Sequence, residues 1–195
     1  MNQFSLFDNK TEDIEISGLT YQPNYISKEE ETTLIQIIDS QVWLNDLKRR
    51  VQHYGYKYDY RARRIDMSMK IGKLPDWLES IAKRLYTEGV FRDIPDQVIV
   101  NEYENGQGIS PHIDCEPCFE DTIVSISLNS AAIMEFSKGT LRVPILLEPR
   151  SIIILKGESR FDWTHSIPVR KSDRYEGLTY LRKRRVSLTF RKVIL

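Results

Sequence analysis

The sequence predicts an α+β protein in which helices pack on one side of an antiparallel β-sandwich or barrel, with a jelly roll as the natural candidate. Two observations lead to this class. The clear helical patterns lie before Pro95, and short β-branched runs fill the rest of the chain. Because helices and strands do not alternate, a parallel α/β sheet is not expected.

Two segments carry the signals of amphipathic helices. Ser27 and Glu30 form a capping-box pattern, which predicts a helix over residues 27–40. Its apolar stripe consists of Leu34, Ile37 and Ile38. Pro75 opens a second helix, which we expect to end near Gly89. One face of that helix carries Trp77, Leu78, Ile81 and Leu85.

Six runs in the second half of the chain have the composition of strands. Each is short, rich in β-branched or aromatic residues, and bounded by Gly, Pro or Asn. They are residues 96–103, 122–128, 131–136, 142–148, 150–157 and 184–193. A series of this kind is typical of a sandwich or barrel.

The composition is that of an ordinary globular domain. Hydrophobic residues make up 41% of the 195 residues, which suffices for a core. No apolar run approaches the roughly 20 residues of a membrane helix, and the N-terminus lacks a secretory pattern. Two cysteines do not make a disulfide framework. We expect a reduced, cytoplasmic, monomeric protein without a membrane partner.

The net charge of zero hides an asymmetry along the chain. Residues 1–47 contain nine acidic and two basic residues, whereas residues 48–195 contain 19 acidic and 26 basic residues. The larger part suits a polyanion, although charge counts alone favour an ordinary solvated surface.

His112 and Asp114 stand two residues apart at the start of PHIDCEPCFEDTIVSISL. Residues i and i+2 of a strand point to the same face, so both side chains can reach one point in a barrel mouth. Two histidines and one carboxylate form the facial triad of non-heme iron oxygenases, and His165 can supply the third ligand. A lone histidine is more often structural, but this pair with a distal histidine favours a metal site.

A triad enzyme that uses 2-oxoglutarate needs a cation for the remote carboxylate of that dianion. One face of the last strand presents Arg185, Ser187, Thr189 and Arg191. At about 3.3 Å per residue the two arginines are too far apart to grip one carboxylate, so we expect one to bind it and the other to lie nearer the metal. Upstream, Asn101 and Tyr103 share a face and can donate to the same dianion. Two surface arginines and a polar strand end are the alternative.

Five motifs, in this order, resemble those of the AlkB family of Fe(II)/2-oxoglutarate-dependent dioxygenases, which act on nucleic acids. They are N-x-Y, H-x-D, IVSISL, GESR with a following His, and R-x5-R in the last strand. The resemblance covers residues 19–193. It implies a double-stranded β-helix (jelly-roll) core with the N-terminal helices packed on one sheet, and Fe(II), 2-oxoglutarate and O2 as cofactors.

The resemblance assigns residues by matching position. The iron ligands and catalytic residues would be His112, Asp114 and His165. The 2-oxoglutarate site would consist of Asn101, Tyr103, Arg185, Ser187 and Arg191, with Arg185 as the anchor of the remote carboxylate.

Within the family, the chain is similar to the AlkB-like domain of the eukaryotic tRNA wobble-uridine hydroxylases, for example in RRVQHYGYKYDY and SLTFRKV. It departs from them in having no room for RNA-recognition and methyltransferase domains and no zinc-binding cysteine cluster near its C-terminus. Cys115 and Cys118 lack the second pair that zinc would need, so incidental cysteines are expected. Glu116 stands where the repair members carry Asp.

Residues 48–70 are expected to form a nucleotide-recognition lid, as similar segments do in this family. Residues 48–64 hold seven basic residues and four tyrosines, and the tyrosines would share one strand face. Aromatic rings stack on bases and basic side chains neutralise phosphates; a hairpin packed on the core is the alternative. His53 is expected in the lid or exposed. The predicted substrate contacts are Arg49, Arg50, Tyr54, Tyr56 and Glu116.

The substrate would be a single-stranded, looped or flipped base, because a base within a duplex cannot reach buried iron. Hydroxylation of an N-methyl group would release formaldehyde, whereas a hydroxyl on a carbon-linked substituent would stay. Hydroxylation of a protein side chain and a cupin-type metal-binding protein are the alternatives. We expect one domain over residues 1–195, with an extension at 1–18, the lid at 48–70 and the catalytic core at 96–193.

Overall fold

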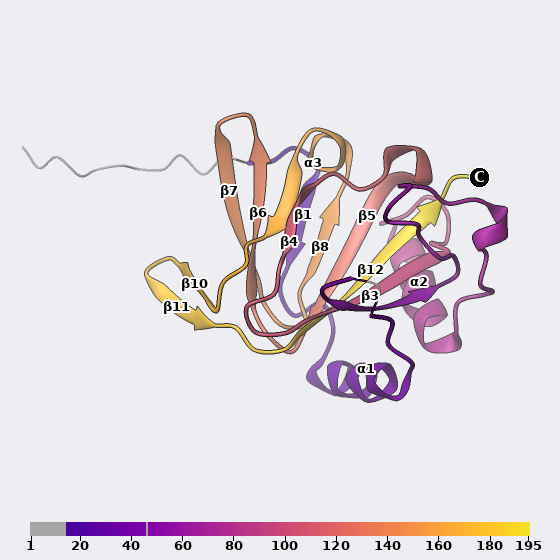
Figure 1. The fold of residues 1–195 in the computed structure, drawn as a ribbon, viewed down its shortest axis with the longest axis horizontal. Helices are drawn as coiled ribbons and strands as arrows, with labels where there is room; N and C mark the ends of the chain where they lie inside the picture. The colour runs from indigo at the N-terminus through magenta and orange to yellow at the C-terminus, as the bar shows by residue number, and fades with distance from the viewer. Residues whose placement is uncertain (1–14, 46) are drawn as a thin grey trace, which may run out of the picture.

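A computed structural model describes residues 15–45 and 47–195 of the chain. Two antiparallel sheets face each other, and the two longer helices lie outside the larger sheet (Figure 1). The large sheet consists, in order across it, of β1 (Leu19–Gln22), β8 (Ile152–Leu155), β5 (Phe119–Leu128), β12 (Arg185–Val193), β3 (Gln97–Tyr103) and β2 (Arg50–Tyr54). The small sheet consists of β4 (Ile109–His112), β9 (Thr164–Ile167), β6 (Ala132–Lys138) and β7 (Leu141–Leu147). The predicted α+β jelly roll is confirmed.

The helices α1 (Lys28–Ser40) and α2 (Asp76–Thr87) cover the outer face of the large sheet. Ser27 caps α1 by accepting a hydrogen bond from the backbone N–H of Glu30 at 3.1 Å. The Glu30 carboxylate accepts instead from Arg84 of α2, at 2.8 Å, so only half of the expected capping box forms. This ion pair ties the two helices to each other.

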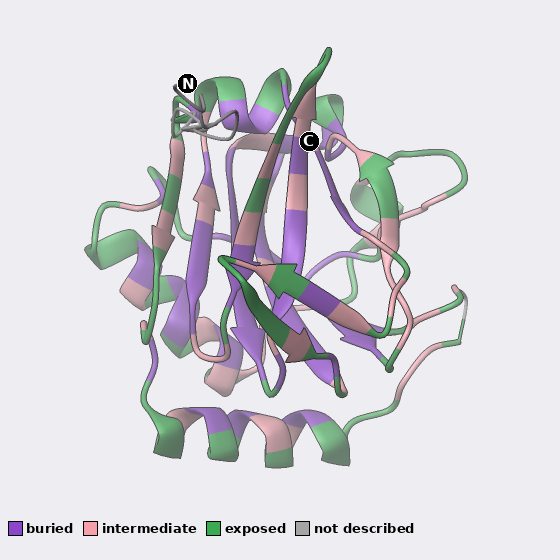
Figure 2. Cartoon of the chain, turned by 90° about the vertical axis from the view of Figure 1, so that its left-hand side faces the viewer, coloured by how far each residue is buried: buried purple, intermediate pink, exposed green. Residues whose placement is uncertain are grey.

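The large sheet separates two apolar clusters, and Figure 2 shows how deeply its central strands are buried. Alternation along β12 explains the separation: Val186, Leu188 and Phe190 face the helices. Burying a side chain such as Phe190 contributes roughly 2–3 kcal/mol. The polar residues between them face the space between the two sheets, so packing of the outer face fixes where the charged side chains of the inner face point.

Several short elements were not expected from the sequence. They are β1, β9, the helix α3 (Gly157–Phe161), and a hairpin of β10 (Ser172–Tyr175) and β11 (Leu178–Leu181) that projects from the body (Figure 1). Strands of four residues give too few alternations to be recognised. None of the helices in the described ranges combines the length and apolar composition that crossing a membrane would require.

The predicted N-terminal extension is partly described. Its residues 1–14 lie outside the described residues, whereas Ile16 is buried in the cluster between the sheets. Gly18 has φ +79°, and a Cβ there would lie 2.0 Å from the carbonyl oxygen of Lys156. The chain therefore enters the fold before residue 19.

Candidate active site

Three side chains converge at one end of the space between the sheets. His112 ends β4 and pairs directly with His165 of β9, and their ring centroids lie 4.4 Å apart. Asp114 follows two residues beyond the end of β4, because the chain there turns into a 3-10 helix at Glu116–Cys118. The strand that we expected to carry both residues is thus shorter than predicted. One ligand atom from each of the three residues still lies within 4.8 Å of the others.

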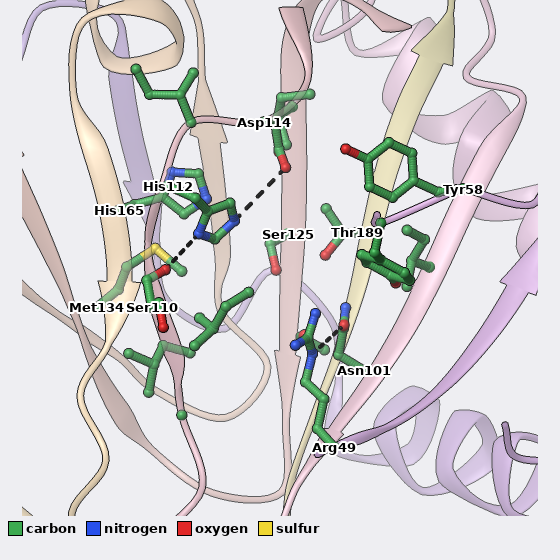
Figure 3. A pocket seen from close by; sticks show the side chains of 18 of the residues that line it. Arg49, Tyr58, Asn101, Ser110, His112, Asp114, Ser125, Met134, His165 and Thr189 are labelled. Atoms are coloured by element: carbon green, nitrogen blue, oxygen red, sulfur yellow. Dashed lines mark hydrogen bonds and ion pairs between the residues drawn. The ribbon is translucent and has the colours of Figure 1, made fainter. Parts of the chain in front are cut away.

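The orientation of these groups suits a ferrous ion. Nδ1 of His112 lies 2.8 Å from the carbonyl oxygen of Ser110, to which it can donate, and this leaves the lone pair of Nε2 for a metal (Figure 3). Nε2 lies 4.0 Å from Oδ1 of Asp114. Two imidazoles and one carboxylate are the donor set of non-heme Fe(II) sites, and they leave coordination positions open.

The surroundings keep the acidic and basic ligands in the forms that bind metal. Burial alone would raise the pKa of Asp114, but the Arg191 guanidinium, with His165 and His112, holds that pKa well below its ordinary value. Burial, reinforced by His112, lowers the pKa of His165 to about 3. Asp114 is therefore ionised and His165 neutral at neutral pH. Arg160, also buried, donates to the backbone oxygen of Asp114 at 2.9 Å and holds the loop in place.

A cavity of about 640 Å³ extends from the triad across the inner face of the large sheet. The side chains of β12 that line it are Arg185, Ser187, Thr189 and Arg191, as the alternation of that strand predicts. Asn101 and Tyr103 of β3 also line it, and they pair across the sheet with Ser187 and Arg185 respectively. All of the predicted 2-oxoglutarate residues are therefore brought into one cavity.

The two arginines of β12 have different surroundings. Arg191 lies at the metal end, where Nη2 is 3.2 Å from Oδ1 of Asp114. Arg185 is buried and donates to Oγ of Ser127 at 2.7 Å, but no carboxylate among the described residues pairs with it. Burial lowers the pKa of Arg185 to about 10, so the side chain is still cationic at neutral pH. A buried cation without a counter-charge is costly, which favours an anion bound beside Arg185.

The tyrosines of the predicted lid do not share one face. The strand β2 ends at Tyr54, and Gly55 follows with φ +77°, where a Cβ would lie 1.8 Å from the carbonyl oxygen of Asp96. Tyr54 packs on Trp77 of α2, on the outer side of the sheet. Tyr56 is buried between the sheets and is not part of the cavity lining. The structure therefore does not bring Tyr54 and Tyr56 into the cavity with the triad.

Tyr58 and Tyr60 line the cavity in their place, in an edge-to-face contact with centroids 5.0 Å apart. The sequence offered one signal for them. Gly55 interrupts the alternating run, so the tyrosines beyond it need not share the face of Tyr54, and of these Tyr58 and Tyr60 line the cavity. Lys48 and Arg63 also line the cavity and were missed, because nothing in a basic stretch distinguishes one charge from the next.

Of the other predicted substrate contacts, one lines the cavity and two do not. Arg49 lines the cavity, whereas Arg50 points to the opposite side and binds Glu102 through two hydrogen bonds. Glu116 is exposed in the 3-10 helix and does not line the cavity. Arg50 and Glu116 are therefore not placed to contact a base. Arg50 begins β2 and lies opposite Glu102 of β3, whereas Arg49 precedes the strand.

Two further expectations are corrected beside the site. Cys115 and Cys118 form a disulfide rather than a pair of incidental thiols, and both sulfur atoms lie against the carbonyl oxygen of Arg63, at 3.1 and 3.5 Å. His53 is buried in β2, with its ring 5.7 Å from that of Tyr60, and is not exposed. The disulfide thus closes the loop that follows the metal ligand Asp114, and it contacts the segment of Arg63.

Comparison with known proteins places the chain in a family. Residues 18–191 match the model of the 2OG-Fe(II) oxygenase superfamily. The chain is 36% identical to the alkylated DNA repair protein ALKBH8 homolog of Arabidopsis thaliana, over 97% of this chain and 61% of that protein. It is 40% identical to the tRNA (carboxymethyluridine(34)-5-O)-methyltransferase ALKBH8 of Macaca fascicularis, over 90% of this chain and 30% of that protein.

The solved structure of OsALKBH1 superposes with a TM-score of 0.68 at 17% identity, covering 92% of this chain and all of that one, which supports the fold. The chain spans about three fifths of the Arabidopsis protein and under a third of the macaque protein. With the matched family and the triad together, the chain belongs to the 2OG-Fe(II) oxygenase superfamily as an AlkB-like domain, whose cofactors are Fe(II), 2-oxoglutarate and O2.

Proposed function

We propose that this protein oxidises a modified base in a nucleic acid, using Fe(II), 2-oxoglutarate and O2. The observation that carries the proposal is the single cavity that joins the triad His112, Asp114 and His165, the unpaired cation Arg185, and a mouth lined by aromatic and basic side chains. Each of these three parts corresponds to one reactant: the metal with its oxygen, the dianion, and the base.

Different residues of the cavity would bind the metal and the 2-oxoglutarate. The triad would hold Fe(II), and Arg185 would form a charge-assisted pair with the remote carboxylate of 2-oxoglutarate. Asn101 and Tyr103 would donate further hydrogen bonds to the same dianion. When bound, the metal and 2-oxoglutarate supply the oxidation: O2 inserts one oxygen atom into a substrate C–H bond and the other into succinate, with release of CO2.

The mouth of the cavity fits a nucleotide. Tyr58 and Tyr60 offer ring faces on which a base can stack. Lys48 and Arg63 lie beside them, and neither makes an ion pair within the described part of the chain, so both are available to phosphates. The triad lies inside the cavity, and a base must therefore leave a duplex stack, or come from a loop or single strand, to reach it.

The relatives support a base as the substrate, because the names of the Arabidopsis and macaque proteins concern alkylated DNA and a tRNA uridine. A role in tRNA modification and a role in repair of alkylated DNA are both consistent with this site. A cytoplasmic location and a monomeric state stay predictions of the sequence.

Mass spectrometry of nucleoside digests tests the proposal. The protein is incubated with Fe(II), ascorbate, 2-oxoglutarate and either total tRNA or methylated single-stranded DNA, with an Asp114→Asn variant as the control. We expect one modified nucleoside to lose the mass of a methylene group or to gain that of an oxygen atom, in the wild type alone. Unchanged digests from both nucleic acids, with succinate formed instead on protein substrates, would contradict the proposal and favour a protein hydroxylase.

A further inference from the structure

Arg49 and Arg50 are adjacent in sequence but have separate environments. Arg50 donates to both carboxylate oxygens of Glu102, and its Cζ lies 5.0 Å from the ring of Trp43. Arg49 points into the cavity instead, and no carboxylate among residues 15–45 and 47–195 forms an ion pair with it. Arg50 thus stabilises the fold, whereas the charge of Arg49 is left for something that enters the cavity.

The one hydrogen bond of Arg49 fixes the orientation of a neighbouring amide. Its Nε donates to Oδ1 of Asn101 at 2.9 Å (Figure 3). A guanidinium has no acceptor, so the oxygen of the amide must face Arg49 and the Nδ2 amine must face away. In the part of the chain that the structure describes, Nδ2 donates to no protein group. The Nδ2 amine of Asn101 is therefore available to donate a hydrogen bond to a ligand in the cavity.

Aromatic rings keep the guanidinium of Arg49 in this place. Cζ of Arg49 lies 5.9 Å from the ring centroid of Tyr60 and 5.7 Å from that of Tyr103. The same Tyr103 ring lies 5.4 Å from Cζ of Arg185. Arg49, Asn101, Tyr103 and Arg185 therefore form one continuous end of the cavity, at which two cations lack a carboxylate partner.

We propose that Arg49 is a positioning residue for 2-oxoglutarate, which orients the Asn101 amide so that Nδ2 donates to the dianion, and that Arg49 is not a phosphate contact. Without Arg49 the amide is free to rotate, and its oxygen would then face the carboxylate and oppose binding. The inference rests on the proposed function, since it requires 2-oxoglutarate in this cavity. It also replaces the role in substrate binding that the sequence alone suggests for Arg49.

Titration calorimetry of 2-oxoglutarate into the full chain, loaded with Mn(II) under anaerobic conditions, tests the inference without turnover. Arg49→Met removes the donor at similar length, and we expect the Kd for 2-oxoglutarate to rise about tenfold. Arg50→Met is the matched control and should change that Kd by no more than about twofold. The Mn(II) affinity and the Tm show that each variant is folded. If Arg49→Met does not fold, Arg49→Leu, which also lacks a donor, replaces it.

A double-mutant cycle shows whether Arg49 acts through the amide. In an Asn101→Ala background, Arg49→Met should raise the Kd by no more than about twofold, because the group that it orients is gone. An equal loss in both backgrounds, or an unchanged Kd for Arg49→Met alone, would overturn the inference.

Binding of a single-stranded RNA oligonucleotide distinguishes a positioning role of Arg49 from a phosphate contact. Its affinity should be the same for Arg49→Met as for the wild type. A salt-dependent loss of RNA binding with an unchanged Kd for 2-oxoglutarate would overturn the inference and leave the proposed function intact. Failure of the Mn(II)-loaded wild type to bind 2-oxoglutarate would contradict both.

Discussion

Nη2 of Arg191 lies 3.2 Å from Oδ1 of Asp114, so one of the two cavity arginines of β12 is paired with a metal ligand. Arg185, at the start of the same strand, has no carboxylate partner in the described part of the protein. One strand therefore presents a neutralised cation at the metal end and an uncompensated cation at the other end. That difference decides which arginine is available to an anionic cosubstrate.

Arg185→Met should separate ligand binding from stability. The dianion loses a charge-assisted pair, so we expect the affinity for 2-oxoglutarate to fall by on the order of a hundredfold. The free energy of unfolding without ligand should stay the same or rise, because a desolvated cation is replaced by an apolar side chain. Calorimetry and urea unfolding of the same variant measure the two quantities.

Arg184→Met is the matched control, because Arg184 lies on the other face and pairs with Asp39 and Glu102. It should lower the stability and leave the affinity for 2-oxoglutarate unchanged. A variant at 185 that is destabilised yet binds 2-oxoglutarate normally would show that Arg185 has a structural role.

Asp114→Asn should weaken metal binding strongly, since the triad loses its only anionic ligand while the shape of the side chain is kept. We expect the Mn(II) affinity to fall by about a hundredfold or more, which exceeds the usual effect of changing a group outside the ligand set. Glu116→Gln removes a carboxylate two residues later, exposed and outside the cavity, and should bind Mn(II) normally. Equal losses in both variants would mean that general charge near the cavity, not ligation, governs binding.

Tyr58→Ala should lower nucleic-acid affinity, whereas Tyr54→Ala should lower stability. Tyr58 lines the cavity, and losing one stacked base lowers nucleic-acid affinity by about tenfold, measured by fluorescence anisotropy. Tyr54 packs on Trp77 and donates to Gln52, so its removal should lower the Tm and spare nucleic-acid binding. If Tyr58→Ala binds RNA and DNA as tightly as the wild type does, Tyr58 does not stack on a base at the mouth of the cavity.

The sequence sufficed for those parts of the site that a single strand carries. Arg185 and Arg191 face the cavity because β12 alternates without interruption, and Asn101 and Tyr103 follow from the same rule in β3. His165 could be chosen as a ligand from the sequence. Its pairing with His112 across β4 and β9 depends on the tertiary structure. Strands of four residues leave too little pattern for that register to be read.

Sequence reasoning failed where the backbone leaves regular geometry. Alternation was extended through Gly55, although a residue with positive φ ends the strand there. As a result, Tyr54 packs on the outer side of the sheet, and Tyr56 is buried between the sheets outside the cavity lining. The disulfide of Cys115 and Cys118 depends on the turn after Asp114, which a count of cysteines cannot reveal. Predictions from period-2 alternation are thus valid only within an unbroken strand.

Asp173 and the groups that bond to its carboxylate form a buried cluster at the base of the hairpin of β10 and β11. We expect this cluster to stabilise the fold. The carboxylate of Asp173 is fully buried and accepts from Nε of Arg182, Nε of Arg170 and the backbone N–H of Ile133, at 2.6, 2.6 and 3.1 Å. Asp173→Asn leaves the Arg182 guanidinium buried without its counter-charge. At neutral pH we expect a loss of about 3–5 kcal/mol in the free energy of unfolding. Glu176→Gln, at the exposed tip of the same hairpin, should change it by less than about 0.5 kcal/mol.

The loss in Asp173→Asn should depend on pH. Burial alone would raise the pKa of Asp173, but hydrogen bonds from Arg182 and Arg170 outweigh burial and lower it. A carboxyl group whose pKa is lower in the folded state contributes its full stability above its unfolded pKa of about 3.9, and loses that contribution as pH falls through the folded value. The gap between wild type and variant in urea unfolding should therefore be constant from pH 7 to about pH 5 and narrow below about pH 4. A gap that widens on acidification would mean that the carboxylate is not the stabilised form.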